Sequence, residues 1–359
     1  MSTPTSGLEI TDLDPFDSAE FDAFHAVYDA AQRFGREELA TNWQCDEMRA
    51  AMQEKTDHRF RSGFCGRLDG VVVAAGFLEG RLVDNLDLCE VQVNVHPDFR
   101  RRGFGSQMLG RLEDAARSRA RRTAIALVDW RADGHPEGEG EVAVEFARRH
   151  GFTMALTEIQ RRLPLPVDDA TLDELAATAA AHHDGYNLRS WSGPVPDELL
   201  QGYAEVSSSL MTEAPTGEID REPESSDPAL VREAEALAAA QNRELYATAA
   251  LSADGIVAAY SNFGVNAEGS PLAYQWGTLV RPEHRGHRLG LAVKVANLRM
   301  LQAARPDLRE VVTWNAEVNA HMISVNEQMG FVIAERCGEM QKFLEPAARG
   351  TSGADAREG

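Results

Sequence analysis

Hydrophobic residues recur along this chain with two different periods. Alternation with a period of two predicts strands, whereas apolar positions three and four apart predict amphipathic helices. The predicted strands cover residues 8–13, 59–68, 71–82, 86–95, 124–129, 158–163, 186–191, 245–251, 256–265, 272–280, 310–314 and 332–344. The predicted helices cover residues 16–34, 104–122, 142–150, 172–183, 197–211, 228–242, 291–304 and 320–329. Asp69-Gly70 joins two alternating stretches and is a strong hairpin signal.

The order of these elements occurs twice. Each copy has a strand, a helix pair, three antiparallel strands, a helix, a strand, a helix and a last strand. This pattern predicts an α+β fold of two tandem domains, each with a mixed, mostly antiparallel sheet flanked by helices. The predicted ranges are 1–165 for the first domain, 166–185 for a linker with a helix, and 186–346 for the second. Composition predicts disorder in residues 1–6 and in the tail 347–359.

One motif appears in both copies. Residues 93–105 and 278–290 each contain an apolar strand end, a Pro, a basic turn, a Gly and the start of a helix. Eight positions separate Pro97 from Gly105, and eight separate Pro282 from Gly290. A turn at a helix N-terminus offers free backbone N–H groups and partial positive charge, which suits a diphosphate. A single such turn would more often be a solvated loop, but the second copy favours binding.

These motifs resemble the GNAT acetyltransferase superfamily, and in particular its tandem members of the mycothiol synthase type. The family turn reads Arg/Gln-x-x-Gly-x-Gly/Ala, which Arg100, Gly103 and Gly105 fit. The second copy departs from it, because Arg288 stands where the middle Gly is expected.

The resemblance implies that acetyl-CoA is the cofactor, held by the turns and by the backbone of the preceding strands. A bulge would open the strand to receive the pantetheine arm. The implied cofactor residues of the second copy are Leu279, Val280, Arg281, Arg285, Gly286, His287, Arg288, Leu289, Gly290, Asn319 and Asn326. Those of the first copy are Val93, Val95, Arg100, Arg101, Arg102, Gly103, Phe104 and Gly105.

Transfer of an acyl group to an amine also needs a neutral amine. Deprotonating a lysine-like amine at pH 7 costs roughly 4–5 kcal/mol, which a nearby carboxylate can offset. An acidic loop in the second copy supplies candidates, with Glu213 as the catalytic one and a substrate-binding set. That set is Glu213, Glu218, Asp220 and Glu222. The alternative is a solvated acidic loop without a role in binding.

Two further catalytic groups are needed. A backbone N–H near Leu279 would stabilise the oxyanion by about 3–4 kcal/mol. A second group would donate a hydrogen bond or a proton to the departing thiolate of coenzyme A. The family often has a Tyr there, but this chain has Asn326 in the second copy and Ala147 in the first. Asn326 is either a hydrogen-bond donor to sulfur or a buried polar helix residue. Asn319 suits an N-cap as well as a cofactor contact. The second copy is expected to be catalytic, with the first as a scaffold or an idle binding site.

Composition narrows the partners. A formal charge of −21 argues against nucleic acid and suits a cationic substrate. The chain has no run of eighteen apolar residues, so no membrane span is expected. Its four cysteines show no close pairing in the sequence, which favours the reducing cytoplasm. His182-His183 lacks a third ligand, so no metal site is expected. The oligomeric state is expected to be a monomer or homodimer.

The sequence therefore predicts an acetyl-CoA-dependent N-acetyltransferase that acts on a primary amine of a small molecule. An amino sugar, an amino acid derivative or a specialised metabolite would fit. Two alternatives stay open: an enzyme that uses a longer acyl-CoA or a peptide N-terminus, and a non-catalytic sensor that binds coenzyme A.

Overall fold

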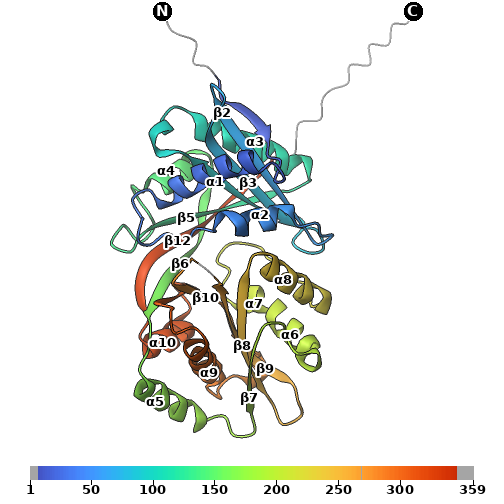
Figure 1. The fold of residues 1–359 in the computed structure, drawn as a ribbon, viewed down its shortest axis with the longest axis vertical. Coiled ribbons are helices and arrows are strands. Elements are labelled where there is room, and N and C mark those ends of the chain that lie inside the picture. The colour runs from blue at the N-terminus through green and yellow to red at the C-terminus, as the bar shows by residue number, and fades with distance from the viewer. Residues whose placement is uncertain (1–6, 268, 346–359) are drawn as a thin grey trace, which may run out of the picture.

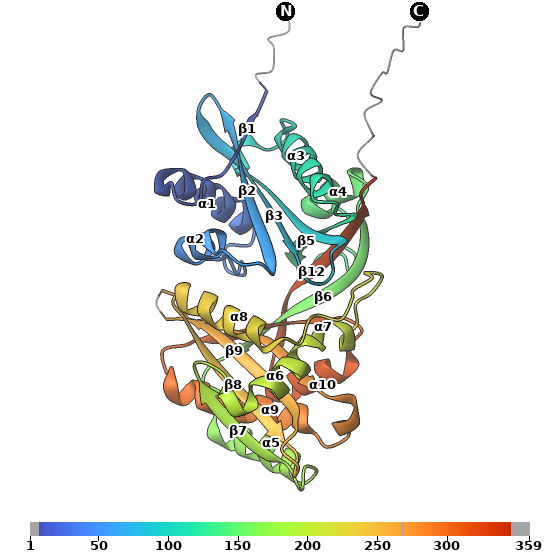
Figure 2. The same ribbon diagram turned by 90° about the vertical axis from the view of Figure 1, so that its right-hand side faces the viewer.

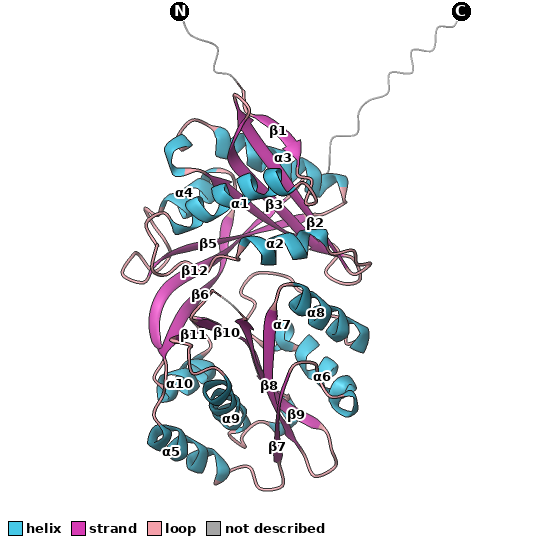
Figure 3. Ribbon diagram, in the orientation of Figure 1, coloured by secondary structure: helices cyan, strands magenta, loops and turns pink. Residues whose placement is uncertain are grey.

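The computed structural model describes residues 7–267 and 269–345, and the predicted disorder of 1–6 and 347–359 lies outside this part. Within it, twelve strands form one mostly antiparallel sheet that runs through both halves of the molecule (Figures 1 and 3). Their order is β1-β2-β3-β4-β5-β12-β6-β11-β10-β9-β8-β7. The predicted α+β fold with helix-flanked, mostly antiparallel sheets is confirmed.

Each half repeats the predicted order of elements. The first half contains β1 (Glu9–Asp12), α1 (Ser18–Arg33), α2 (Cys45–Gln53), β2 (Arg59–Leu68), β3 (Val71–Arg81), β4 (Leu88–Val95), α3 (Phe104–Ser118), β5 (Thr123–Arg131), α4 (Val142–Arg149) and β6 (Thr153–Pro164). After α5 (Asp169–Ala180), the second half contains β7 (Asn187–Ser192), α6 (Asp197–Ser208), α7 (Leu210–Glu213), α8 (Pro228–Ala240), β8 (Arg243–Leu251), β9 (Val257–Asn266), β10 (Leu272–Val280), α9 (Leu289–Ala304), β11 (Glu310–Ala316), α10 (Ala320–Met329) and β12 (Val332–Phe343).

The helices cover both faces of the sheet. In the first half, α1 and α2 lie on one face and α3 and α4 on the other (Figure 2). In the second half, α6 and α8 pack on one side of β8 and β9, and α9 packs on the other with α5 behind it. No helix in the described ranges combines the length and the hydropathy that crossing a membrane requires.

The last strand of each half does not stay in its own half. The segment 158–163 was expected to close the first domain, but β6 pairs with β11 of the second half along its length. β12 crosses in the opposite direction and lies between β5 and β6. As a result, Met340 of β12 belongs to the hydrophobic core of the first half, and Leu163 of β6 belongs to that of the second. The two halves therefore share one continuous sheet. A division at residues 165 and 186 assigns β6 to the first half and β12 to the second by sequence, although each strand also pairs with strands of the other half.

The strand before each basic turn separates from its parallel neighbour. β10 pairs with β11 only from Leu272 to Gln275, and a register shift against β9 follows between Gln275 and Gly277. β4 likewise pairs with β5 only from Leu88 to Glu90. The expected opening of the sheet is thus present in both halves, whereas the bulge that accompanies it is found in β10.

Candidate active site

One large cavity lies where the two halves meet. Its volume is about 1230 Å³. Its walls come from α1, β5, β6 and β12 on one side and from β10, the basic turn, α9, β11 and α10 on the other. The two exchanged strands thus form part of its lining, so neither half could build this cavity alone.

The basic turn of the second half opens into this cavity. Arg285, Gly286, Arg288, Leu289 and Gly290 all line it. A Cβ added at Gly290 would meet only the side chain of Val280, at 3.7 Å, so the space in front of the turn is open. The turn therefore keeps the form that a diphosphate site needs, although its sequence departs from the family pattern.

The Arg at position 288, where the family has Gly, is accompanied by a Gly at position 286, where the first turn has Arg101. Gly286 and Arg288 have positive φ values of 90° and 50°, and at the equivalent places Arg101 and Gly103 have 64° and 83°. Each turn thus has two left-handed residues, one Gly and one Arg, in opposite order. Arg at such a position costs about 1–2 kcal/mol relative to an ordinary conformation.

The basic turn of the first half is narrowed at Gly105 by a side chain from α4. A Cβ on Gly105 would lie 3.2 Å from the ring of Phe146, which extends from α4 over the turn. Arg100 uses its guanidinium to donate hydrogen bonds to the carbonyls of Val95 (3.1 Å) and Ala31 (2.9 Å). The first-copy candidates do not line the large cavity: Val93, Val95, Arg100, Arg101, Arg102, Gly103, Phe104 and Gly105.

Two predicted residues of the second copy also point elsewhere. The backbone N–H of Arg281 donates to Ala258 O at 2.9 Å, and its guanidinium bonds to Val257 O and pairs with Glu205. His287 is exposed, and its ring contacts the carbonyl of His182 at 3.2 Å. Neither side chain lines the cavity, because each serves to hold the turn against its neighbours.

The acidic loop contributes only one of its predicted carboxylates. Glu213 lines the cavity but forms an ion pair with Arg285 at 2.7 Å. Glu218, Asp220 and Glu222 lie outside the cavity. The loop docks on the first half instead: Ile219 is buried there, and Glu222 exchanges hydrogen bonds with Asn85.

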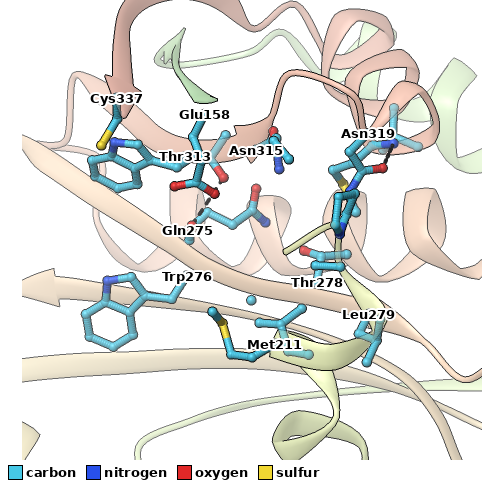
Figure 4. Close-up of a pocket in the computed structure, with 18 of the residues that line it drawn as sticks. Glu158, Met211, Gln275, Trp276, Thr278, Leu279, Thr313, Asn315, Asn319 and Cys337 are labelled. Carbon is cyan, nitrogen blue, oxygen red and sulfur yellow. Dashed lines mark hydrogen bonds between the residues drawn. The ribbon is translucent and has the colours of Figure 1, made fainter. Parts of the chain in front are cut away.

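The carboxylates that do face the cavity come from the centre of the shared sheet. Asp129 of β5, Cys337 of β12 and Glu158 of β6 lie directly opposite one another in register, so their side chains share one face. Glu339 follows two residues along β12 and lines the same cavity. In Figure 4 the Glu158 carboxylate points from the sheet towards Gln275 and Thr313.

Glu158 differs from its neighbours because it has no ion-pair partner among the described residues. Asp129 pairs with Arg36 at 3.2 Å, and Glu339 pairs with Arg221. Burial, reinforced by the negative charge of Glu339, raises the pKa of Glu158 from 4.5 to about 7. Burial likewise raises the pKa of the Cys337 thiol well above its usual value, which argues against a thiolate nucleophile.

The floor of the β10–β11 opening is a buried polar network. Lys294 of α9 lines the cavity and donates to Gln275 Oε1 at 2.5 Å and to Asn326 Oδ1 at 2.7 Å. Asn326 donates in turn to Asn315 and is fully buried, one layer behind the cavity wall. Asn319 lines the cavity and also caps α10, accepting from Met322 N at 3.2 Å, as its position predicted. Leu279 and Val280 lie in the part of β10 that faces no strand on the β11 side.

Sequence reasoning missed Glu158 and Lys294. Glu158 is the first residue of a predicted core strand, and nothing local distinguishes it from an edge charge. Lys294 stands three residues after Leu291 and four before Leu298, on the apolar stripe of a helix that is covered on almost every side, and a charged residue in that stripe was passed over. The useful signal for α9 was its overall apolar composition, which is typical of a helix buried all round.

The comparisons with known proteins agree with this architecture. Residues 24–152 match the model of the acetyltransferase (GNAT) family. A tandem GNAT protein from the clavulanic acid biosynthesis pathway is 27% identical, with a TM-score of 0.77 over 95% of this chain and 99% of that one. A GCN5-related N-acetyltransferase from Sphaerobacter thermophilus has the same fold at 15% identity, with a TM-score of 0.64 over 97% and 98% of the two chains. No match was found among curated proteins. Residues 24–152 thus match the GNAT acetyltransferase family, and the chain over nearly its whole length is similar to a tandem GNAT protein, which supports acyl transfer as its chemistry.

Proposed function

We propose that this protein transfers an acetyl group from acetyl-CoA to the primary amine of a small molecule, and that Glu158 accepts the amine proton. The observation that carries the proposal is the placement of a carboxylate, without an ion-pair partner among the described residues, in the cavity onto which the basic turn opens. Burial raises the pKa of this carboxylate to about 7, which suits a base. The second half would hold the donor, and the first half would complete the acceptor side.

The residues of the second half fit coenzyme A. The turn 285–290 has an open approach and two cationic side chains, Arg285 and Arg288, for a diphosphate. Beyond the bulge, β10 leaves backbone groups free on one side, where an extended amide-containing arm can pair as an added strand. When bound, acetyl-CoA supplies an activated thioester carbonyl, and the N–H of Leu279 or a neighbour in β10 would donate to its oxygen.

The acceptor side suits an organic cation. Trp43, Trp276 and Trp314 line the cavity together with Asp129 and Glu158. Aromatic faces and carboxylates both attract ammonium groups. A base with a pKa near the working pH is well matched to remove the proton of such a group before it attacks. An amino sugar, an amino acid derivative or a specialised metabolite would fit the cavity, and the likeness to a protein of a specialised pathway favours the last.

The test is the variant Glu158→Gln, assayed by release of coenzyme A with a panel of small amines. Loss of the base should lower kcat/KM by about 10²- to 10⁴-fold. In the wild type, deprotonation of Glu158 should give the pH–rate profile an ascending limb governed by a pKa of about 7, and the variant should lack this limb. Calorimetry should find the same affinity for acetyl-CoA in both proteins, and Glu139→Gln, an exposed carboxylate outside the cavity, serves as the control.

Two results would contradict the proposal. A wild-type pH profile in Glu158→Gln would remove Glu158 from the role of base. Binding of acetyl-CoA without turnover across a broad amine panel would instead favour a coenzyme A sensor. Turnover only with longer acyl-CoA donors would identify a longer acyl-CoA, rather than acetyl-CoA, as the donor.

A further inference from the structure

Lys294 is a lysine buried inside the molecule. Its side chain is only 1% exposed, and its two contacts are the neutral amide oxygens of Gln275 and Asn326. Within the described ranges it has no carboxylate partner, and the ring of Phe331 lies 5.1 Å from Nζ. Lysine is almost never buried without a partner, because an isolated ammonium loses its hydration there. A buried lysine without a carboxylate partner therefore indicates a function that a neutral side chain at position 294 could not perform.

Its position coincides with the closed end of the β10–β11 opening. Gln275 is the last residue of β10 that pairs with β11, and Thr313 is its partner. Lys294 is bonded to the side chain of Gln275, so Nζ lies where the two strands begin to separate. From Leu279 back to Gln275 the strand covers about 13 Å, at roughly 3.3 Å per residue. An extended arm that starts at the turn and pairs along β10 would therefore bring its reactive end towards this point.

The other groups around this point cannot donate a proton readily. Asn326, Asn315 and Gln275 are amides, and Thr313 donates its hydroxyl hydrogen to the carbonyl of Gln275 at 3.2 Å. Glu158 is already assigned to the amine. An ammonium has three N–H donors, of which the described partners of Lys294 take two.

On this geometry, and resting on the proposed acyl transfer, we propose that Lys294 is the catalytic acid that protonates the departing coenzyme A sulfur. As the new C–N bond forms and the C–S bond breaks, the sulfur takes the bonding electron pair and then a proton from the Lys294 ammonium. The acceptor ammonium first loses one proton, which passes through Glu158 to solvent, and the neutral amine then loses a second proton to Glu158 as the amide forms. Glu158 later releases that proton to solvent and Lys294 regains one, so the two groups return to their starting states.

The protonation equilibrium of Lys294 is compatible with this role. Burial lowers the pKa of its ammonium from 10.5 to about 7. An acid with a pKa near neutrality can both give up and regain a proton during turnover. The amides of Gln275 and Asn326 accept hydrogen bonds from either form, so the site does not need to rearrange.

The experiment compares the wild type with Lys294→Met, which has nearly the same length and no charge. The first measurement is the pKa of the thiol of bound coenzyme A, followed by thiolate absorbance. Lys294 should lower that pKa by at least one unit relative to the variant. In turnover, Lys294→Met should lower kcat about 100-fold with little change in the KM for acetyl-CoA.

A readout without ligand checks that the lysine titrates as inferred. A folded pKa near 7 against 10.5 in the unfolded chain means that the unfolded state binds more protons in this interval. The stability of the wild type relative to Lys294→Met should therefore rise with pH between about 7 and 10.5. Asn297→Leu is the matched control, because Asn297 is a fully buried polar residue on the same helix that does not line the cavity. It should change stability without altering the thiol pKa.

The outcomes separate this inference from the function on which it rests. If the wild type neither binds coenzyme A nor turns over, the proposed function fails and this inference fails with it. If the wild type binds and turns over, but the thiol pKa and kcat are the same in Lys294→Met, the assignment of Lys294 alone is overturned.

Discussion

Glu213 and Arg285 face each other at the mouth of the turn that would receive the diphosphate. Their ion pair spans 2.7 Å, and both side chains are partly exposed to solvent. A pair of this kind is worth about 0–1 kcal/mol, because water screens it and both side chains lose freedom. A diphosphate and Glu213 would compete for the same guanidinium, so the carboxylate is expected to weaken cofactor binding rather than assist catalysis.

Glu213→Gln should therefore tighten coenzyme A binding up to about fivefold, which corresponds to the loss of at most ~1 kcal/mol of competition. Isothermal titration calorimetry at two salt concentrations measures this, and the gain should shrink at high salt. Glu283→Gln is the control, because it removes an exposed charge close to Arg285 but outside the cavity and the ion pair. Weaker binding in Glu213→Gln, or an equal gain in both variants, would contradict the competition.

At the scale of single residues, the sequence was informative where chemistry is local. The basic turn could be predicted because its Pro, Arg and Gly positions follow one another along the chain. Glu158 and Asp129 could not, because they meet only through the register of β12 between their strands. The position of the acidic loop could not be predicted for the same reason: charge density along the chain does not reveal which half Ile219 docks against.

The bulge in β10 is the element that opens the site. Trp276 lies at the register shift, and its indole ring covers Gly264 of the neighbouring strand β9. A side chain at residue 264 would overlap that ring, so the small residue in β9 permits the ring to lie flat on the sheet. The bulge and Gly264 therefore form one unit, in which a contact in the adjacent strand positions a residue that lines the cavity.

Gly264→Ala should displace Trp276 and reduce kcat about tenfold or more, since a shift of even 1 Å at a reaction site can be costly. Tryptophan fluorescence should report the moved ring. Gly110→Ala is the control: it lies on an exposed face of α3 with nothing within 4 Å of the added Cβ, and it should stabilise the helix by about 0.5–1 kcal/mol. Unchanged fluorescence and activity in Gly264→Ala would show that the bulge does not depend on this contact.

Most elements could be predicted because their signals are local. Asp69-Gly70 forms the expected turn, with both residues at positive φ. α2 was expected as the second helix of a pair but was not located, because it is short, with nine residues, and begins with a Gln-Glu capping pair rather than the more usual Ser or Thr. The helix expected over 197–211 divides into α6 and α7 at Ser209, where serine hydroxyls bond to carbonyls three residues earlier.

At the scale of the whole molecule, the exchange of β6 and β12 decides how the halves behave. Strand pairing partners could not be inferred from the sequence, since β12 has the same alternating pattern whichever strand it joins. Its true neighbours, β5 and β6, lie far from it along the chain. Because each hydrophobic core contains residues from a strand of the other half, unfolding one core removes contacts from the second.

The chain should therefore unfold as one unit rather than as two separate domains. Differential scanning calorimetry should give a single transition whose calorimetric and van't Hoff enthalpies agree. Leu112→Ala in the first core and Leu298→Ala in the second, both fully buried, should each destabilise the protein by about 2–5 kcal/mol and shift that same transition. Two peaks, of which each variant moves only one, would mean that the shared strands do not couple the halves. A shared transition would also account for a cavity built from both halves: its walls would be present only when the entire sheet is formed, so that acyl transfer and folding would be lost over the same temperature range.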